Sequence, residues 1–227
     1  MRLLAVAIAA TLFVPSTSPA QGRPVVNPCA AQGSRVTPTL KPVDEAARRA
    51  DFVEFRRRLQ DAVTRKDTAA VLAAVDPGVR IDFGNSGGVQ AFKDRVIGNR
   101  AEDFWKEFGT ILRLGGRFRT NDAFDAPYTF SAWPENLDSF ECLAVIGTRV
   151  RVREAAKLDA RIVTQLDFAI VRATPAEVET QGWRGIQLAD GRVGFVSSQY
   201  LRSPVDHRAL FQFHDGRWWL MAYVDGD

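Results

Sequence analysis

The sequence predicts an α+β protein whose first half is rich in helices and whose second half is all β. Between residues 43 and 140, apolar residues recur at helical spacing in several segments. From residue 141 onward they alternate in short runs, which is typical of strands. The expected divisions are a signal peptide over 1–20, a flexible leader over 21–42, an N-terminal α+β domain over 43–140, a small barrel over 141–203 and a C-terminal hairpin over 204–227 that packs on the N-terminal domain.

The first twenty residues have the pattern of a secretory signal peptide. Arg2 precedes an unbroken apolar run from Leu3 to Val14, and the small residues Ser18 and Ala20 fit a cleavage site after Ala20. The alternative is an N-terminal membrane anchor, but the apolar run is short for a hydrocarbon core of about 30 Å. We therefore expect an exported protein, periplasmic or extracellular, with no transmembrane segment in the mature chain.

The chain has two cysteines, Cys29 and Cys142. An even number of cysteines in an oxidising compartment predicts a disulfide, and the alternative is two separate buried thiols. The net charge of +3 is small and spread along the chain, so nucleic acid is not an expected partner.

The N-terminal domain is expected to contain four helices and one strand. Asp51 and Glu54 resemble a capping box, although Asp44 can start this first helix one or two turns earlier. The expected helices cover about 51–65, 68–75, 89–96 and 104–112, and the expected strand covers 79–83. Asp76-Pro77-Gly78 is predicted to stop the second helix, and 122–133 is predicted to be an irregular, aromatic-rich loop.

The segment after Cys142 carries short strands and a hairpin signal. Strands are expected near 143–145, 150–153, 168–173, 183–188 and 192–197. Asp190-Gly191 predicts a tight hairpin turn in which both central residues tolerate positive φ. Short strands at this spacing favour a small barrel.

The same segment resembles the bacterial SH3-like domain of cell-envelope proteins, over about 143–201. The matching positions are Val150, Val152, Arg153, Trp183, Ile186, Asp190, Gly191, Gly194, Phe195, Val196, Tyr200 and Leu201. Three departures are that Arg151 replaces the usual Asn, Phe195 replaces a Trp, and Glu154-Ala155-Ala156 replaces a turn. These departures bear on the ligand, because the family's groove is shaped by that turn and that tryptophan.

The resemblance implies a binding module that holds a protein at peptidoglycan or its peptide stems and has no catalytic residues. Trp183, Arg184 and Tyr200 form a candidate aromatic and basic ledge for a carboxylated peptide. Trp183 and Phe195 are equally what a small barrel needs as core. The candidate binding residues are Arg151, Arg153, Trp183, Arg184, Tyr200, Tyr128 and Trp133.

The C-terminal segment predicts a second hairpin, with strands over about 209–214 and 218–224 around Asp215-Gly216. Together with two helices followed by a strand in the first half, this hairpin resembles the nuclear-transport-factor-like α+β cone. That resemblance implies that the barrel is an insertion. Because a closed barrel has no need of these two strands, the hairpin is expected to return to the first domain and supply sheet for its helices to cover.

The sequence shows no catalytic motif, so a non-enzymatic protein without cofactor or metal is expected. His207 and His214 are seven positions apart on an expected strand and cannot form a paired metal site, and Asp206 and His207 point apart if they are strand neighbours. The expected partner is a cell-wall peptide, peptidoglycan or an envelope protein. The rival is a small-molecule-binding, hydrolase or isomerase activity in a cavity of the first domain, for which Asp82, Asp122 and Tyr128 are the residues of interest.

Overall fold

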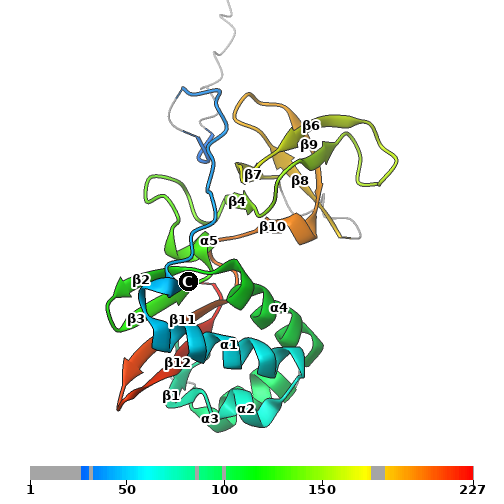
Figure 1. Ribbon diagram of the computed structural model, residues 1–227. Helices are drawn as coiled ribbons and strands as arrows, with labels where there is room; N and C mark the ends of the chain where they lie inside the picture. The colour runs from blue at the N-terminus through cyan, green and yellow to red at the C-terminus, as the bar shows by residue number, and fades with distance from the viewer. Residues whose placement is uncertain (1–26, 31–32, 85–86, 99–100, 175–181, 227) are drawn as a thin grey trace, which may run out of the picture.

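The protein folds into two lobes, each built around its own sheet (Figure 1). The computed structural model describes residues 27–30, 33–84, 87–98, 101–174 and 182–226. The expected signal peptide over 1–20 and residues 21–26 and 31–32 of the expected leader lie outside the described residues. Helices and strands are both present in quantity, so the α+β fold class is confirmed.

The first lobe contains a five-stranded sheet in the order β1-β12-β11-β3-β2. Its strands are β1 (Val75–Arg80), β2 (Arg117–Thr120), β3 (Ala123–Ala126), β11 (Arg208–His214) and β12 (Arg217–Val224). The helices of this lobe are η1 (Ala46–Arg48), α1 (Ala50–Thr64), α2 (Thr68–Leu72), α3 (Val89–Ala91), the π-helical η2 (Phe92–Gly98), α4 (Ala101–Leu114) and α5 (Tyr128–Ser131).

Aromatic side chains join the helices of the first lobe to its sheet. Phe52 of α1 is fully buried, and its ring lies 4.3 Å from that of Phe124 in β3 and 4.7 Å from that of Trp218 in β12. On α4, Phe104 and Phe108 contact the ring of Tyr223 in β12. The apolar stripes of α1 and α4 therefore bury the same face of the sheet, which stabilises both helices.

The C-terminal hairpin is the centre of this sheet. β11 pairs antiparallel with β12 and β3, and β12 pairs in parallel with β1. Asp215 and Gly216 have φ of 50° and 77°, as expected for a tight turn with two left-handed residues. Strands from before residue 127 and after residue 207 thus share one sheet, and the second lobe lies between them in the chain.

Two sequence-based boundaries in the first lobe were wrong. Asp76-Pro77-Gly78 does not end a helix but lies inside β1, where Pro77 is tolerated because β1 is an edge strand. The segment 122–133 is not an irregular loop, since it forms β3 and α5. β3 is buried at all four positions, including Asp125, and shows no alternation of apolar and polar residues, so periodicity could not identify it.

The second lobe is a seven-stranded sheet in the order β10-β4-β7-β8-β9-β5-β6. Its strands are β4 (Cys142–Val145), β5 (Val150–Arg153), β6 (Ile162–Leu166), β7 (Ile170–Ala173), β8 (Trp183–Gln187), β9 (Val193–Ser197) and β10 (Leu201–Arg202), with the 3-10 turn η4 (Ser198–Tyr200) before β10. Within the described residues the outer strands β10 and β6 do not pair with each other, so the closed five-stranded barrel expected from the sequence is not seen.

The core of the second lobe is aliphatic. It is formed by the buried residues Val145, Val150, Val152, Leu166, Ala169, Val171, Ile186, Leu188 and Val196. Trp183 and Phe195 are only half-buried and are not part of it, so the alternative that they serve as core is not supported. Asp190-Gly191 also differs from expectation: only Gly191 has positive φ, because the turn runs from Leu188 to Gly191 within a longer loop.

A third apolar cluster and a disulfide lie where the lobes meet. The predicted disulfide between Cys29 and Cys142 is present, and both cysteines are buried in this cluster. Tyr128 is fully buried in it, and Trp133 packs against it. The disulfide therefore ties the N-terminal segment to the start of the second lobe.

No helix in the described part of the chain is long and apolar enough to cross a membrane.

Candidate functional site

A groove on the second lobe brings together four of the seven candidate binding residues. Its volume is about 580 Å³, and it is lined by Arg151, Arg153, Trp183 and Tyr200 together with Arg149, Leu158 and neighbouring polar side chains. We call it the arginine groove. These residues come from β5, the loop after it, β8 and η4, which are far apart in sequence.

The alternation of β5 places its arginines. Val150 and Val152 are buried in the core, and Arg151 between them is exposed. Arg149 precedes the strand with φ of 51°, and its backbone N–H donates to the carboxylate of Asp167. The turn that ends at Arg149 therefore directs the chain into β5 with Arg151 on the side of the groove.

Arg153 has a structural role as well. It is 7% exposed, and its Nη1 donates to the backbone carbonyl of Ala160 over 2.7 Å. This hydrogen bond holds the 154–161 loop, which carries Leu158, against the edge of the groove. Leu158 itself is 77% exposed, so an apolar side chain is available to a ligand there.

Aromatic side chains form the opposite part of the groove. Trp183 begins β8, pairs with Ser197 of β9 and is half-buried. Tyr200 is 44% exposed, and its backbone carbonyl accepts a hydrogen bond from the N–H of Ile146. Both rings are thus held by the sheet while part of their surface remains exposed to solvent, as in binding sites for ligands with apolar and polar parts.

The charge of the arginine groove is positive. Three arginines line it, and no Asp or Glu is among its lining residues. In the described part of the chain, neither Arg149 nor Arg151 forms an ion pair. Guanidinium groups next to aromatic and aliphatic surfaces suit a ligand that carries carboxylates on an apolar framework.

The other three candidate residues lie elsewhere. Arg184 follows Trp183 in β8, and neighbours along a strand point to opposite faces, so it is not in the groove. Tyr128 and Trp133 belong to the junction cluster, where the Trp133 indole N–H donates to the carbonyl of Leu137. These three assignments are corrected, since burial or strand direction keeps the side chains away from the groove.

Sequence reasoning missed Arg149, Leu158, Gln165 and Gln199, which also line the groove. Arg149 could have been found from its place one step before an alternating strand. Leu158 could not, because its loop has no sequence pattern that predicts a place in the groove.

A second cavity, of about 520 Å³, lies in the first lobe and contains titratable side chains. Asp206, His207, Tyr223, Asp225 and Glu107 are among its lining residues. We call it the His207 cavity. The His207 ring stacks on that of Tyr223 with centroids 4.7 Å apart, and its Nδ1 lies 3.7 Å from a carboxylate oxygen of Asp225.

Asp206 and His207 lie in the loop before β11 and not in a strand. The expectation that they point apart was therefore wrong, because strand alternation does not apply in a loop. Surrounding protein atoms raise the pKa of the Asp206 carboxyl, with a nearby Glu107 acting in the same direction and Arg202 opposing it. The backbone N–H of Ser203 donates to Asp206 over 2.8 Å and fixes its position.

The residues proposed earlier for a first-lobe site do not converge. Asp82 pairs with Arg95 over 3.4 Å, Asp122 pairs with Arg49 on the surface, and Tyr128 is fully buried. Burial alone raises the pKa of Tyr128 to about 12. The residues that do converge in this lobe are those of the His207 cavity.

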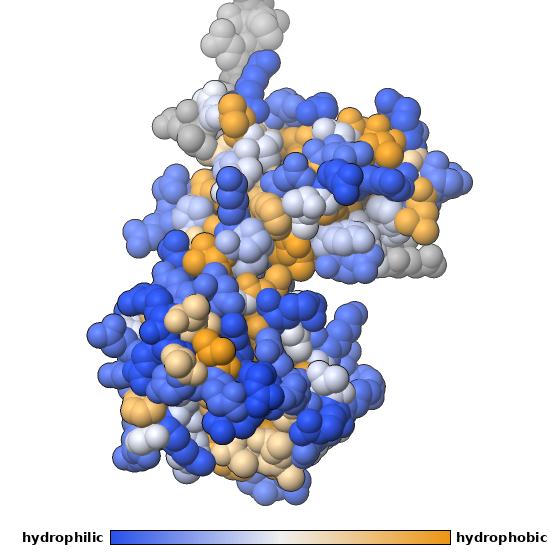
Figure 2. All heavy atoms as spheres, viewed as in Figure 1, coloured by the Kyte–Doolittle hydropathy of each residue, from blue (hydrophilic) through white to orange (hydrophobic). Residues whose placement is uncertain are grey.

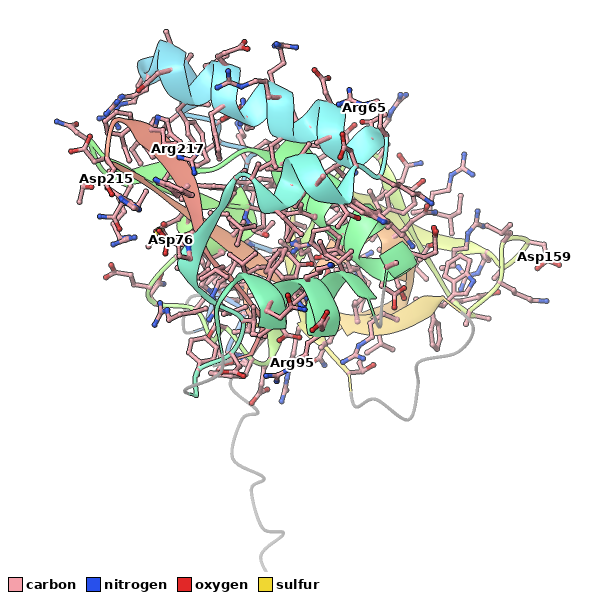
Figure 3. All side chains as sticks on the ribbon, turned by 90° about the horizontal axis from the view of Figure 1, so that it is seen from below. Arg65, Asp76, Arg95, Asp159, Asp215 and Arg217 are labelled. Atoms are coloured by element: carbon pink, nitrogen blue, oxygen red, sulfur yellow. A yellow bond between two sulfur atoms is a disulfide. The ribbon has the colours of Figure 1, made fainter. Side chains whose placement is uncertain are left out.

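The second histidine, His214, forms contacts that link strands of the first lobe. His214 Nε2 lies 3.0 Å from a carboxylate oxygen of Asp76, and Nδ1 lies 3.1 Å from one of Asp215. Figure 3 shows Asp76 and Asp215 beside the C-terminal hairpin. His214 thus links β1 to the end of β11, and within the described residues no group of His, Cys, Asp and Glu could hold a metal ion.

Comparisons with known proteins leave the function to be argued from these sites. No protein-family model matches the chain, and no curated protein is similar to it. The structure is similar to a crystal structure of a protein from Xanthomonas campestris that was assigned as a calcium/calmodulin dependent protein kinase II association domain. The two are 11% identical, the match covers 84% of this chain and 98% of that chain, and the TM-score is 0.26.

Proposed function

We propose that this is an exported, non-enzymatic envelope protein whose second lobe binds carboxylated peptides of the cell wall. The observation that carries the proposal is the arginine groove, which combines three arginines with exposed parts of Trp183 and Tyr200 and has no lining carboxylate. The peptide stems of peptidoglycan offer carboxylates on an aliphatic backbone, which matches this surface.

Two further observations support the proposal. The Cys29–Cys142 disulfide is compatible with export, since disulfides persist in oxidising compartments. The sequence between 143 and 201 resembles the SH3-like domains of envelope proteins, and its matching residues Arg153, Trp183 and Tyr200 line the groove. Arg151, which departs from that family's pattern, adds a cation to the same surface.

The experiment is a pulldown with purified peptidoglycan. We expect peptidoglycan to retain the oxidised wild-type chain. Retention of Arg151→Ala should fall at least tenfold, which is on the order of the loss of one charge-assisted hydrogen bond, and retention of Trp183→Ala should fall by a similar factor. Arg161→Ala is the matched control, because Arg161 is exposed on the same lobe but pairs with Glu154 outside the groove. Equal retention of all four proteins contradicts the proposal. Co-purification of a partner protein without wall fragments favours a purely structural interaction protein instead.

A second candidate function is proton-transfer chemistry in the His207 cavity. The observation that favours it is that an imidazole, a phenol and several carboxylates line one cavity, with the Asp225 carboxylate next to His207 Nδ1. The test is hydrolysis of p-nitrophenyl acetate by the wild type, His207→Ala and the matched control His214→Ala. A rate that falls only in His207→Ala supports an active cavity, and equal rates argue against it.

A further inference from the structure

A large cleft separates the two lobes and is not used by the proposed function. Its volume is about 910 Å³, and it is seen as the hollow between the lobes in Figure 2. Trp105, Lys106 and Arg113 of α4 lie on one side, and Gln199 and Arg202 lie on the other. We call it the inter-lobe cleft.

The arginine groove and the inter-lobe cleft adjoin and share two lining residues. Ser197 at the end of β9 and Gln199 in η4 line both of them. Gln199 Nε2 lies 3.4 Å from Ser197 Oγ, so these two side chains form one ridge that faces the groove on one side and the cleft on the other. A ligand chain long enough to cross Ser197 and Gln199 can therefore occupy both depressions.

The cleft extends the positive charge of the groove. Its two carboxylates are neutralised, Glu102 by Lys66 over 2.7 Å and Glu107 by Arg202 over 2.6 Å. Lys106 and Arg113 also line the cleft, and neither forms an ion pair with another described residue. With the two unpaired arginines of the groove, they make a track of uncompensated positive charge that spans both lobes.

Polar atoms in the wall of the cleft also lack partners. Ser198 Oγ and Arg202 Nε are buried and have no hydrogen-bond partner among the described residues, and both residues line the cleft. Buried polar atoms are usually satisfied, so such atoms mark places where a polar ligand group adds hydrogen bonds. Gly182 on the same wall leaves open space, since a Cβ there would meet nothing within 4 Å.

The sizes of the two depressions favour a ligand with more than one unit. A single small-molecule site usually has a volume of about 300–1,000 Å³, and the groove, at about 580 Å³, and the cleft, at about 910 Å³, are each of that size. We infer that the track binds an extended, carboxylate-bearing wall polymer, with one peptide stem in the arginine groove and further units of the same strand in the inter-lobe cleft. This inference rests on the proposed function, because it takes the wall peptide as the occupant of the groove.

The experiment compares two probes on the full oxidised chain by isothermal titration calorimetry. One is a single disaccharide–tetrapeptide unit, and the other is a glycan strand that carries several such units. Occupation of a second subsite by a linked unit adds avidity, so we expect the strand to bind at least about tenfold tighter than the unit after correction for the number of units. Lys106→Gln with Arg113→Gln is expected to remove this gain and to leave binding of the single unit unchanged.

The matched control is Arg57→Gln with Arg58→Gln, which removes two charges from the exposed face of α1, and it is expected to keep the gain. If the unit binds and the strand binds no tighter, the inference is overturned while the proposed function stands. If neither probe binds, both are overturned. If poly-glutamate with the same number of carboxylates binds as tightly as the strand, the track is a general polyanion site and the inference is overturned.

Discussion

Replacing Arg202 of β10 by Met should lower the free energy of unfolding by more than the loss of an exposed ion pair does. The Arg202 side chain is only 5% exposed and crosses from the second lobe to the first. Its Nη2 lies 2.6 Å from a carboxylate oxygen of Glu107 and also donates to the backbone carbonyl of His207. Arg202→Met keeps most of the aliphatic stem but leaves that carboxylate and that carbonyl without their donor.

The magnitude follows from the burial of the two partners. Removing one partner of a fully buried ion pair costs about 3–5 kcal/mol. The Glu107 side chain is 32% exposed, so water replaces part of the lost interaction, and we expect a loss of about 2–3 kcal/mol in the free energy of unfolding. Arg161→Met is the control, because Arg161 makes a 2.8 Å pair with Glu154 in which the two side chains are 75% and 47% exposed, and exposed pairs contribute about 0–1 kcal/mol.

The assay is urea unfolding at pH 7 followed by circular dichroism, on Arg202→Met, Glu107→Gln and the double variant. The double variant should be less destabilised than the sum of the two single variants, because the second substitution removes a group that the first has already left without a partner. A loss for Arg202→Met below about 0.5 kcal/mol, equal to that of Arg161→Met, would refute the idea that this pair couples the lobes.

Three further outcomes are expected. Reduction of the Cys29–Cys142 disulfide, which spans 113 residues, should lower the free energy of unfolding by about 4–5 kcal/mol in the chain-entropy model. The measurement is urea unfolding with and without reductant, and an unchanged midpoint of the urea transition would contradict the prediction. Burial raises the pKa of Asp206 above its unfolded value of about 3.9, so its contribution to folding stability is present below that value and is lost as pH rises through the folded pKa. Asp206→Asn should therefore raise the Tm at pH 7 and not at pH 3. An equal change in Tm at both pH values would contradict this. Tyr128→Phe should leave the Tm unchanged or raise it, because the buried hydroxyl has no hydrogen-bond partner among the described residues, and a large fall in Tm would show that the hydroxyl is satisfied.

Sequence periodicity identified the helices well because amphipathic stripes are strong signals. The expected helix over 51–65 is observed as α1, and the helix marked by Phe104 and Phe108 is observed as α4. Fully buried strands gave no such signal. β3 is buried on both faces, so it lacks the alternation that predicts a strand. Pro77 lies in the edge strand β1, so Asp76-Pro77-Gly78 was mistaken for a turn that ends a helix.

The candidate site was predictable only in part, for a geometric reason. Arg151 and Arg153 could be placed on one strand, and Trp183 and Tyr200 on later elements, from the resemblance and the spacing alone. Their convergence depends on the order of strands in the sheet, where β5 lies next to β9 although three strands separate them in sequence. The His207 cavity was missed because a loop, and not a strand, carries Asp206 and His207.

The place of β12 in the first sheet has a consequence for biosynthesis. β12 lies between β1 and β11, so the hydrophobic faces of α1 and α4 lack their cover until residues 208–224 have been synthesised. The second sheet has all its strands before residue 203 and can form earlier. A chain that stops short of β11 would therefore present an ordered second sheet beside an open, aggregation-prone helical layer, and quality-control proteases would meet that layer first.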